Sequence, residues 1–141
     1  MADIEILDGN WDQLGELASE IRRVVFIEEQ QVPLEEEWDG RDAECRHFLA
    51  LRHEIPLGTA RLLPDGHIGR VAVLSEARGL GIGVALMEAA IEAARHSGHD
   101  QVELAAQTHA LDFYERLGFT ICGDEFMDAG IPHRNMRLTL R

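Results

Sequence analysis

A glycine-rich turn between an expected strand and an expected helix constrains this chain most. Alternating apolar and β-branched residues at 68–74 predict a strand, and residues 84–95, which lack glycine and proline, predict a helix. Arg78-Gly79-Leu80-Gly81-Ile82-Gly83 lies between them. The first turn of a helix carries unpaired backbone N–H groups at the positive end of the helix dipole. The turn is therefore typical of a phosphate-binding site.

Two common phosphate-binding motifs do not fit this turn. The dinucleotide fingerprint G-x-G-x-x-G fails because Val84 stands where the last glycine is required. A P-loop requires a lysine, and all 13 basic residues of the chain are arginines. The turn therefore belongs to another class of phosphate site, or it has only a packing role.

The turn and a second segment together resemble one superfamily. R-G-x-G-I-G at residues 78–83 is similar to the pyrophosphate loop of the GNAT superfamily, the acyl-CoA-dependent N-acetyltransferases. Residues 110–119, with Phe113-Tyr114 and Gly118-Phe119, resemble its A-x-x-F-Y-x-x-x-G-F element. The resemblance covers at least residues 71–119. It implies an enzyme that uses acetyl-CoA as co-substrate.

The order of expected elements is that of the GNAT fold. Strands are expected at 4–7, 47–51, 57–63, 68–74, 101–107, 121–127 and 135–140, and helices at 10–30, 83–96 and 109–117. Residues 34–44 read as an acidic connection without periodicity. We predict a single α+β domain over residues 1–141, with a mixed central sheet of six to seven strands flanked by about four helices.

The resemblance implies which residues hold acetyl-CoA. The glycine-rich turn would bind the pyrophosphate, and the backbone of the central strand would bind the pantetheine and donate an N–H to the thioester oxygen. Gln107 stands where many members of the superfamily have a cofactor-contacting asparagine. The predicted cofactor residues are Val71, Ala72, Val73, Arg78, Gly79, Leu80, Gly81, Ile82, Gly83, Val84 and Gln107.

Tyr114 is the predicted catalytic acid. It is the only tyrosine, and the resemblance places it where a phenol protonates the departing CoA sulfur. The alternative is an ordinary core aromatic residue. The general base stays open, because the strand at 68–74 lacks the glutamate that many relatives carry there. The candidates are Glu28, Glu29, His47, His109 and His133.

Two flanking segments resemble one GNAT subgroup. Residues 22–30 match its R-x-x-V-F-x-x-E-Q pattern, and residues 130–136 match its G-I-P-H-x-x-M closing hairpin. In GNAT folds both segments border the acceptor side. Glu29, Gln30 and His133 are therefore the predicted substrate-binding residues. The resemblance does not name the acceptor.

Charge and composition limit the partners. The formal charge is −13, which argues against a nucleic acid. Residues 1–45 hold 14 acids against three arginines, a balance of −11, which favours a cationic partner or serves only solubility. Cys45 and Cys122 lack metal-ligand spacing, and no metal is expected. No signal peptide or membrane segment is expected, so we expect a cytoplasmic protein, and a homodimer is possible.

We therefore predict an N-acetyltransferase that transfers an acetyl group from acetyl-CoA to a primary amine of a small cationic acceptor. The amine attacks the thioester directly, and Tyr114 protonates the leaving thiolate. Two other classes stay open. One is a non-catalytic acyl-CoA-binding module or sensor, and the other is a protein-interaction domain that binds a partner's anion.

Overall fold

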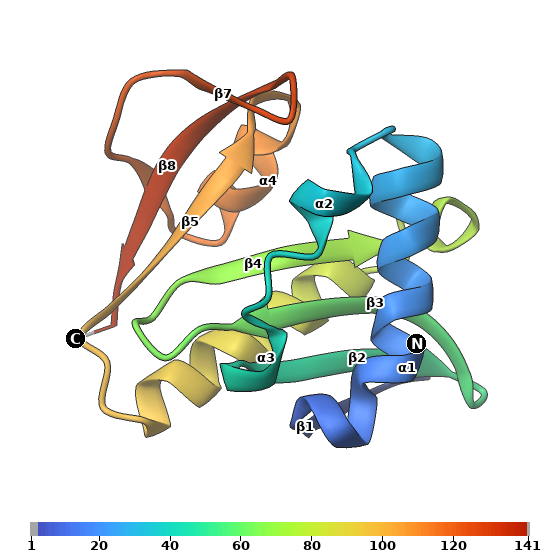
Figure 1. Cartoon of the computed structure of the whole chain (residues 1–141). Coiled ribbons are helices and arrows are strands. Elements are labelled where there is room, and N and C mark those ends of the chain that lie inside the picture. The colour runs from blue at the N-terminus through green and yellow to red at the C-terminus, as the bar shows by residue number, and fades with distance from the viewer. Residues whose placement is uncertain (1–2, 141) are drawn as a thin grey trace.

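Two antiparallel sheets meet at one end and diverge at the other in the computed structural model (Figure 1), which describes residues 3–140. Residues 1, 2 and 141 of the predicted domain lie outside this range. The first sheet has the order β1 (Ile4–Gly9), β2 (Arg46–Arg52), β3 (Ile55–Leu62), β4 (Ile68–Val73). The second has the order β5 (Gln101–Gln107), β8 (Ile131–Thr139), β6 (Thr120–Ile121), and β7 (Phe126–Asp128) also pairs with β8.

The main helices cover opposite faces of the first sheet (Figure 1). On one face, α1 (Trp11–Arg22) packs Leu14 and Ile21 against Leu49. On the other, α3 (Ile82–His96) contributes Leu86 and Met87 to the larger core, which extends to the second sheet. The short helices are α2 (Leu34–Glu37) and α4 (Leu111–Arg116), with 3₁₀ turns η2 (Asp42–Glu44), η3 (Ser75–Ala77) and η4 (Thr108–Ala110). The α+β class and the number of about four α-helices are confirmed for the described residues, although α2 lies outside the segments expected to be helical.

The prediction of one mixed sheet is wrong. Within residues 3–140, every strand ladder is antiparallel, and β4 and β5 are joined only by an isolated parallel bridge between His67 and Glu103. Beyond that bridge the two strands separate (Figure 1). In the described part of the chain, eight strands in two sheets therefore replace the expected six or seven in one. Sequence periodicity detects strands, but it does not say where neighbouring strands part.

Three local expectations also differ from the structure. Residues 34–44 contain α2 and η2 and are not an irregular connection. The strand expected at 121–127 is broken into β6 and β7. The strand expected at 135–140 begins earlier, at Ile131, because Ala129 and Gly130, both with positive φ, make the turn that pairs Asp128 with Ile131.

The helical segment predicted at 10–30 begins as an α-helix and continues as a π-helix. Asn10 and Gln13 form the expected capping box, in which each backbone N–H donates to the other side chain over 2.9 Å. After Arg22 the chain widens into a π-helix, η1 (Arg23–Glu29), closed by a bond from Gln30 N–H to the Val25 carbonyl. π-helical turns frequently occur at functional sites, and this one borders the cavity described below.

Candidate active site

A cavity of about 1310 Å³ lies where the two sheets diverge. Its walls come from η1, β4, the glycine-rich turn, the end of β5, α4 and β8. Leu80 is 47% exposed and lies outside the lining. Apart from the candidate general bases, which are taken up below, every other predicted site residue lines this one cavity: Glu29, Gln30, Val71, Ala72, Val73, Arg78, Gly79, Gly81, Ile82, Gly83, Val84, Gln107, Tyr114 and His133.

The amino end of α3 opens into this cavity with free backbone donors. Gly81, the N-cap, has φ +83°, a left-handed conformation that glycine adopts without strain, and no side chain caps the helix. The first intrahelical bond runs from Ala85 N–H to the Gly81 carbonyl. Apart from the adjacent residues of the chain, no heavy atom lies within 4 Å of a Cβ built on Gly79 or Gly81. The turn therefore presents helix N–H groups to open space, as a phosphate site requires.

β4 presents one edge of its backbone to the same cavity. Its other edge pairs with β3, for example at Ala72 with Thr59 and at Val73 with Gly58. An unpaired strand edge offers alternating N–H and C=O groups to a ligand with amide bonds. The Val73 carbonyl already accepts a bond of 3.0 Å from Arg78 Nε. The edge is otherwise suited to the pantetheine predicted for it.

Tyr114 lies on α4 within an aromatic cluster. Its ring packs edge-to-face on Phe113 and Phe119, with centroids 5.0 and 6.1 Å away. A Cβ built on Gly83 would lie 3.1 Å from Phe113, so glycine at that position lets α3 approach α4 closely. Burial raises the pKa of Tyr114 to about 12. The phenol is therefore protonated at neutral pH and can serve as a proton donor.

Arg78 and Glu29, predicted for the cofactor and the acceptor, bind one another. The Arg78 guanidinium donates two bonds, of 2.6 and 2.8 Å, to the Glu29 carboxylate. The hydrogen bonds from Arg78 lower the pKa of Glu29, so this carboxylate is anionic and a weak base at neutral pH. Both side chains are more than a third exposed, and such pairs contribute only about 0–1 kcal/mol. A phosphate can therefore replace Glu29 on the arginine.

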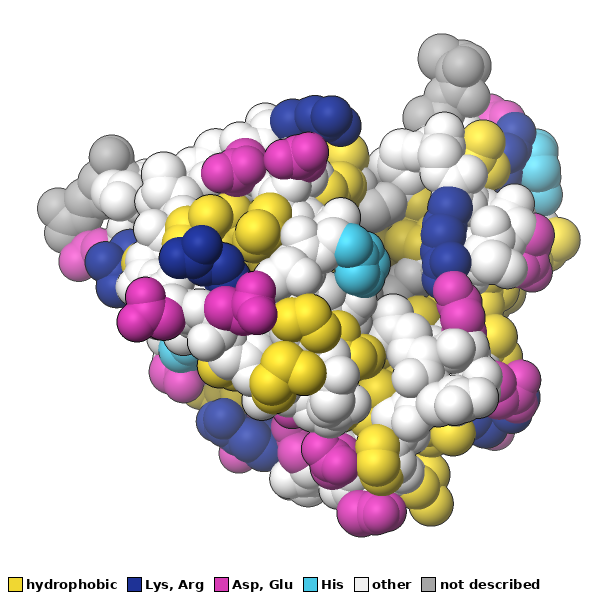
Figure 2. Space-filling model, turned by 90° about the horizontal axis from the view of Figure 1, so that it is seen from above, with side chains coloured by type: hydrophobic (Ala, Val, Ile, Leu, Met, Phe, Trp, Pro, Cys, Tyr) yellow, Lys and Arg dark blue, Asp and Glu magenta, His cyan; other side chains and the backbone are white. Residues whose placement is uncertain are grey.

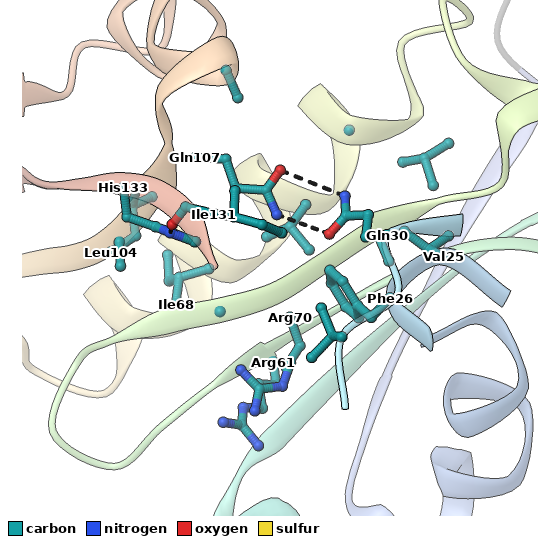
Figure 3. A pocket seen from close by; sticks show the side chains of 18 of the residues that line it. Val25, Phe26, Gln30, Arg61, Ile68, Arg70, Leu104, Gln107, Ile131 and His133 are labelled. Atoms are coloured by element: carbon teal, nitrogen blue, oxygen red, sulfur yellow. Dashed lines mark hydrogen bonds between the residues drawn. The ribbon is translucent and has the colours of Figure 1, made fainter. Parts of the chain in front are cut away.

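Gln30 and Gln107 meet across the cavity (Figure 3). Gln107 Nε2 donates to Gln30 Oε1 over 2.9 Å, and Gln30 Nε2 donates back over 3.5 Å. His109 Nε2 lies 2.6 Å from Gln107 Oε1, which accepts its proton. This amide pair links the residue that follows η1 to the last residue of β5.

His133 has the most suitable environment for a base among the five candidates. It is 8% exposed, is stacked on Phe126, and its Nδ1 lies 2.7 Å from the Ile131 carbonyl. A carbonyl can only accept, so Nδ1 carries the proton and Nε2 of the neutral ring carries the lone pair. No hydrogen bond to Nε2 is found within residues 3–140. The β5–β8 register places His133 opposite Gln107, at the cavity wall.

The other candidate bases are less suitable. Glu28 is paired with Arg23 and lies outside the cavity lining. His47 also lies outside it, is buried, and has Nε2 2.9 Å from the Asp42 carbonyl. Burial lowers the pKa of His47. As described above, Glu29 and His109 are engaged by Arg78 and Gln107.

Three arginines inside the structure were not anticipated from the sequence. Arg22, Arg61 and Arg70 bind a set of three carboxylates, those of Glu37, Asp39 and Asp42. Arg22 is 1% exposed and lies between the rings of Trp11 and Trp38. Arg61 and Arg70 border the cavity, and Arg22 lies behind them. The sequence did contain a signal for two of them, since Arg61 and Arg70 each lie within an otherwise apolar strand. A charge in such a strand is expected to need a carboxylate partner.

On the face shown in Figure 2, arginines lie beside carboxylates, and the acidic side chains do not form one continuous patch there. Two acids of the first 45 residues form ion pairs, Asp8 with Arg46 and Glu44 with Arg41. Within residues 3–140 no helix is long and apolar enough to span a membrane, and no cluster of three metal-ligating side chains occurs.

Two diverging sheets around an uncapped helix terminus are typical of acyl-CoA-dependent acyltransferases. Comparison of this chain with known proteins identifies its family. Residues 20–140 match the model of the acetyltransferase (GNAT) domain, so the chain belongs to the GNAT acetyltransferase family. The Bacillus subtilis uncharacterized N-acetyltransferase YjcF is 38% identical over 93% of this chain and 96% of its own. A solved acyl-CoA N-acyltransferase from Pseudomonas aeruginosa is 35% identical (TM-score 0.81, covering 95% and 98%), and Escherichia coli ElaA is 31% identical (TM-score 0.83, covering 95% and 98%).

Proposed function

We propose that this N-acetyltransferase transfers the acetyl group of acetyl-CoA to a primary amine of a small acceptor that is cationic, as an ammonium, in solution. The observation that carries the proposal is that the uncapped end of α3 and the protonated Tyr114 border one cavity. The two flanking motifs of the GNAT subgroup, at 22–30 and 130–136, border the same cavity and support an acceptor site there.

The proposed binding mode uses backbone groups for most contacts. The N–H groups at Ile82, Gly83 and Val84 hold the pyrophosphate, with Arg78 as its side-chain partner. The free edge of β4 at Val71–Val73 holds the pantetheine. Acetyl-CoA supplies an activated thioester, and a backbone N–H at Val71 or a neighbour stabilises the charge that develops on the thioester oxygen.

Proton movements are assigned to two side chains. His133 Nε2 accepts a proton from the ammonium of the acceptor, directly or through a water, which leaves a neutral nitrogen lone pair to attack the thioester carbon. A new C–N bond forms and the C–S bond breaks. Tyr114 gives its phenolic proton to the departing thiolate, and the nitrogen of the new amide gives its surplus proton back to the Tyr114 phenolate through water. The products are an N-acetyl amide and free CoA thiol.

Gly81→Asp should weaken acetyl-CoA binding by at least tenfold. The change places a carboxylate beside the pyrophosphate, and like charges repel strongly there. Gly81→Asn is the matched control, because asparagine has the same shape, carries no charge and tolerates positive φ. Calorimetry should show a much larger loss of acetyl-CoA affinity for the aspartate variant than for the asparagine variant. Equal affinities for both folded variants and the wild type would disprove the loop assignment.

Release of free thiol from acetyl-CoA, dependent on an added amine, is the direct test of the proposed function. Acetyl-CoA that raises the melting temperature without any amine-dependent thiol release across a broad amine panel would instead indicate the non-catalytic acyl-CoA-binding module. Absence of any effect of acetyl-CoA would favour the protein-interaction domain.

His133→Gln should lower kcat/KM for the amine about 10²-fold at neutral pH, the lower end of the range for acid–base groups. The defect should shrink as the pH approaches the pKa of the amine, near 10, because a neutral amine needs no base. Initial rates of thiol release between pH 6 and 10 would measure this. His109→Gln is the control, and its rate should stay close to wild type. A His133→Gln defect that is constant across this pH range would argue against a base role.

A further inference from the structure

Two arginines form the wall of the cavity beyond the central strand residues assigned to the thioester. Arg61 comes from β3 and Arg70 from β4, and both line the cavity. Figure 3 shows their side chains below Phe26, on the other side of β4 from Gln107 and His133. Arg61 is only 4% exposed. Neither residue has a role in the chemistry proposed above.

Existing carboxylates satisfy these guanidinium groups only in part. Arg61 donates to Asp39 over 2.5 and 3.0 Å and to Asp42 over 2.9 Å. Arg70 Nη2 donates to the Glu36 and Glu37 carbonyls over 3.2 and 3.1 Å and to Asp39 over 3.4 Å.

Some donor groups of the two arginines lack a well-aligned acceptor. The Nε atoms of both Arg61 and Arg70 are buried and make no hydrogen bond, although Arg70 Nε lies 2.9 Å from Glu37 Oε1 in an ion pair. Arg70 Nη1 also has no hydrogen bond within residues 3–140, and the Arg70 side chain is 26% exposed, so a ligand can reach it. Buried polar groups without partners are uncommon in folded proteins, and each suggests a missing acceptor.

The backbone at Arg70 adopts a strained conformation. Its φ is +50°, a left-handed conformation that costs a non-glycine residue free energy and is concentrated at ligand-binding positions. The β3–β4 ladder is irregular at the same place, between Thr59 and Arg61. The strand therefore departs from regular geometry where the two arginines meet.

Local electrostatics also favour an added anion. Burial and repulsion from Arg61 lower the pKa of Arg70, even though Glu37 and Asp39 oppose this effect. The carboxylates on the protein therefore do not fully offset the cost of holding a cation here. A negatively charged ligand group would offset more of it.

We propose that Arg70, backed by Arg61, binds an anionic group of the acceptor, a carboxylate or a phosphate ester. The inference rests on the proposed acetyl transfer and defines its substrate class: an amine at one end and an anion at the other. Arg70 directly precedes Val71, whose backbone N–H is assigned to the thioester oxygen, and one strand residue rises only about 3.3 Å. An acceptor of amino acid size can therefore place its amine at the thioester and its anionic group at Arg70.

Matched acceptors test the proposal. The panel is glycine, β-alanine and γ-aminobutyrate, each with its carboxamide and with the aminoalkylphosphonate of equal chain length. We expect kcat/KM for thiol release with the best carboxylate or phosphonate to exceed that of its amide about 10- to 150-fold, the range for a hydrogen-bonded charge. The carboxylate and phosphonate arms identify which anion the site prefers. If kcat/KM for the amides equals that for the carboxylates and the phosphonates, the proposal is wrong.

Arg70→Gln should reduce that preference to less than threefold while leaving the amide rate nearly unchanged. Arg70→Lys keeps the charge without the guanidinium fork and should give an intermediate preference. Arg46→Gln is the matched control, because Arg46 is exposed, pairs with Asp8 and lies outside the cavity lining. A wild-type preference in folded Arg70→Gln or Arg70→Lys protein would overturn the assignment to Arg70.

Direct binding separates this inference from the proposed function. Calorimetric titration of the same amino carboxylates and phosphonates into the protein with CoA bound does not require turnover. Binding that is lost in Arg70→Gln, without thiol release from any amine, would support the anion site and reject acetyl transfer. Amine-dependent thiol release without a preference for anionic acceptors would support acetyl transfer and reject the anion site.

Discussion

Tyr114→Phe should lower the turnover number about 10²- to 10⁴-fold, the usual range for the loss of an acid–base group. The substitution keeps the ring and its edge-to-face contacts with Phe113 and Phe119 and removes only the phenolic proton. Affinity for acetyl-CoA should therefore change little, and the loss should appear in kcat. Single-turnover measurements with saturating acetyl-CoA and amine would isolate the chemical step.

The pH profile supplies a second check on Tyr114. The catalytic acid must be protonated, and burial raises the pKa of Tyr114 to about 12. Activity that depends on this proton is therefore retained up to high pH and lost only as the pH rises through about 12. Below pH 10 the wild-type profile should show no descending limb from this residue. Unchanged turnover of Tyr114→Phe, where chemistry limits the rate, would assign the acid role to water or another group.

Elements with strong local signals were predictable from the sequence. The strand at 101–107 was predicted with the bounds that the structure shows, and the predicted helix at 83–96 begins within one residue of its observed start at Ile82. Alternation and helix caps are local properties of the chain, so a single sequence reveals them. The split between β4 and β5 was not predictable in the same way. Pairing depends on contacts between residues more than 30 positions apart.

The same distinction applies to the candidate site. The glycine-rich turn and the Phe113-Tyr114 element have spacings that can be recognised, and they line one cavity, as predicted site residues should. No spacing reveals that Arg78 binds Glu29 or that Gln107 binds Gln30, because each pair joins distant segments. Arg61 and Arg70 likewise belong to no recognised motif. Their signal is a charge within an apolar strand, and its partners lie at positions 36–42.

Arg22→Met should destabilise the protein by about 3–5 kcal/mol, the usual cost of removing one partner from a buried ion pair. Arg22 is 1% exposed and binds Glu37 over 3.0 Å and Asp42 over 2.7 Å. Methionine fills part of the volume between the two tryptophans but leaves these carboxylates with fewer donors. Urea unfolding at pH 7, followed by circular dichroism, would measure the change in the free energy of unfolding.

Arg23→Met is the matched control for Arg22→Met. The neighbouring arginine also binds two carboxylates, those of Glu20 and Glu28, but all three side chains are exposed. Exposed pairs contribute little, so this variant should unfold at nearly the wild-type urea concentration. Equal unfolding midpoints for the two variants would show that the buried network does not stabilise the fold.

The loss in Arg22→Met should also depend on pH in a defined direction. Burial raises the pKa of Asp42, but hydrogen bonds and attraction from Arg22 and Arg61 outweigh burial and lower it on balance. A carboxylate with a lowered folded-state pKa stabilises the fold above its unfolded pKa, near 3.9, and loses this effect as the pH falls through the folded value. The difference in stability between wild type and Arg22→Met should therefore be full at pH 6–7 and shrink below about pH 4. A difference that stays constant down to pH 3 would assign the loss to altered packing around Trp11 and Trp38 and not to the ion pairs.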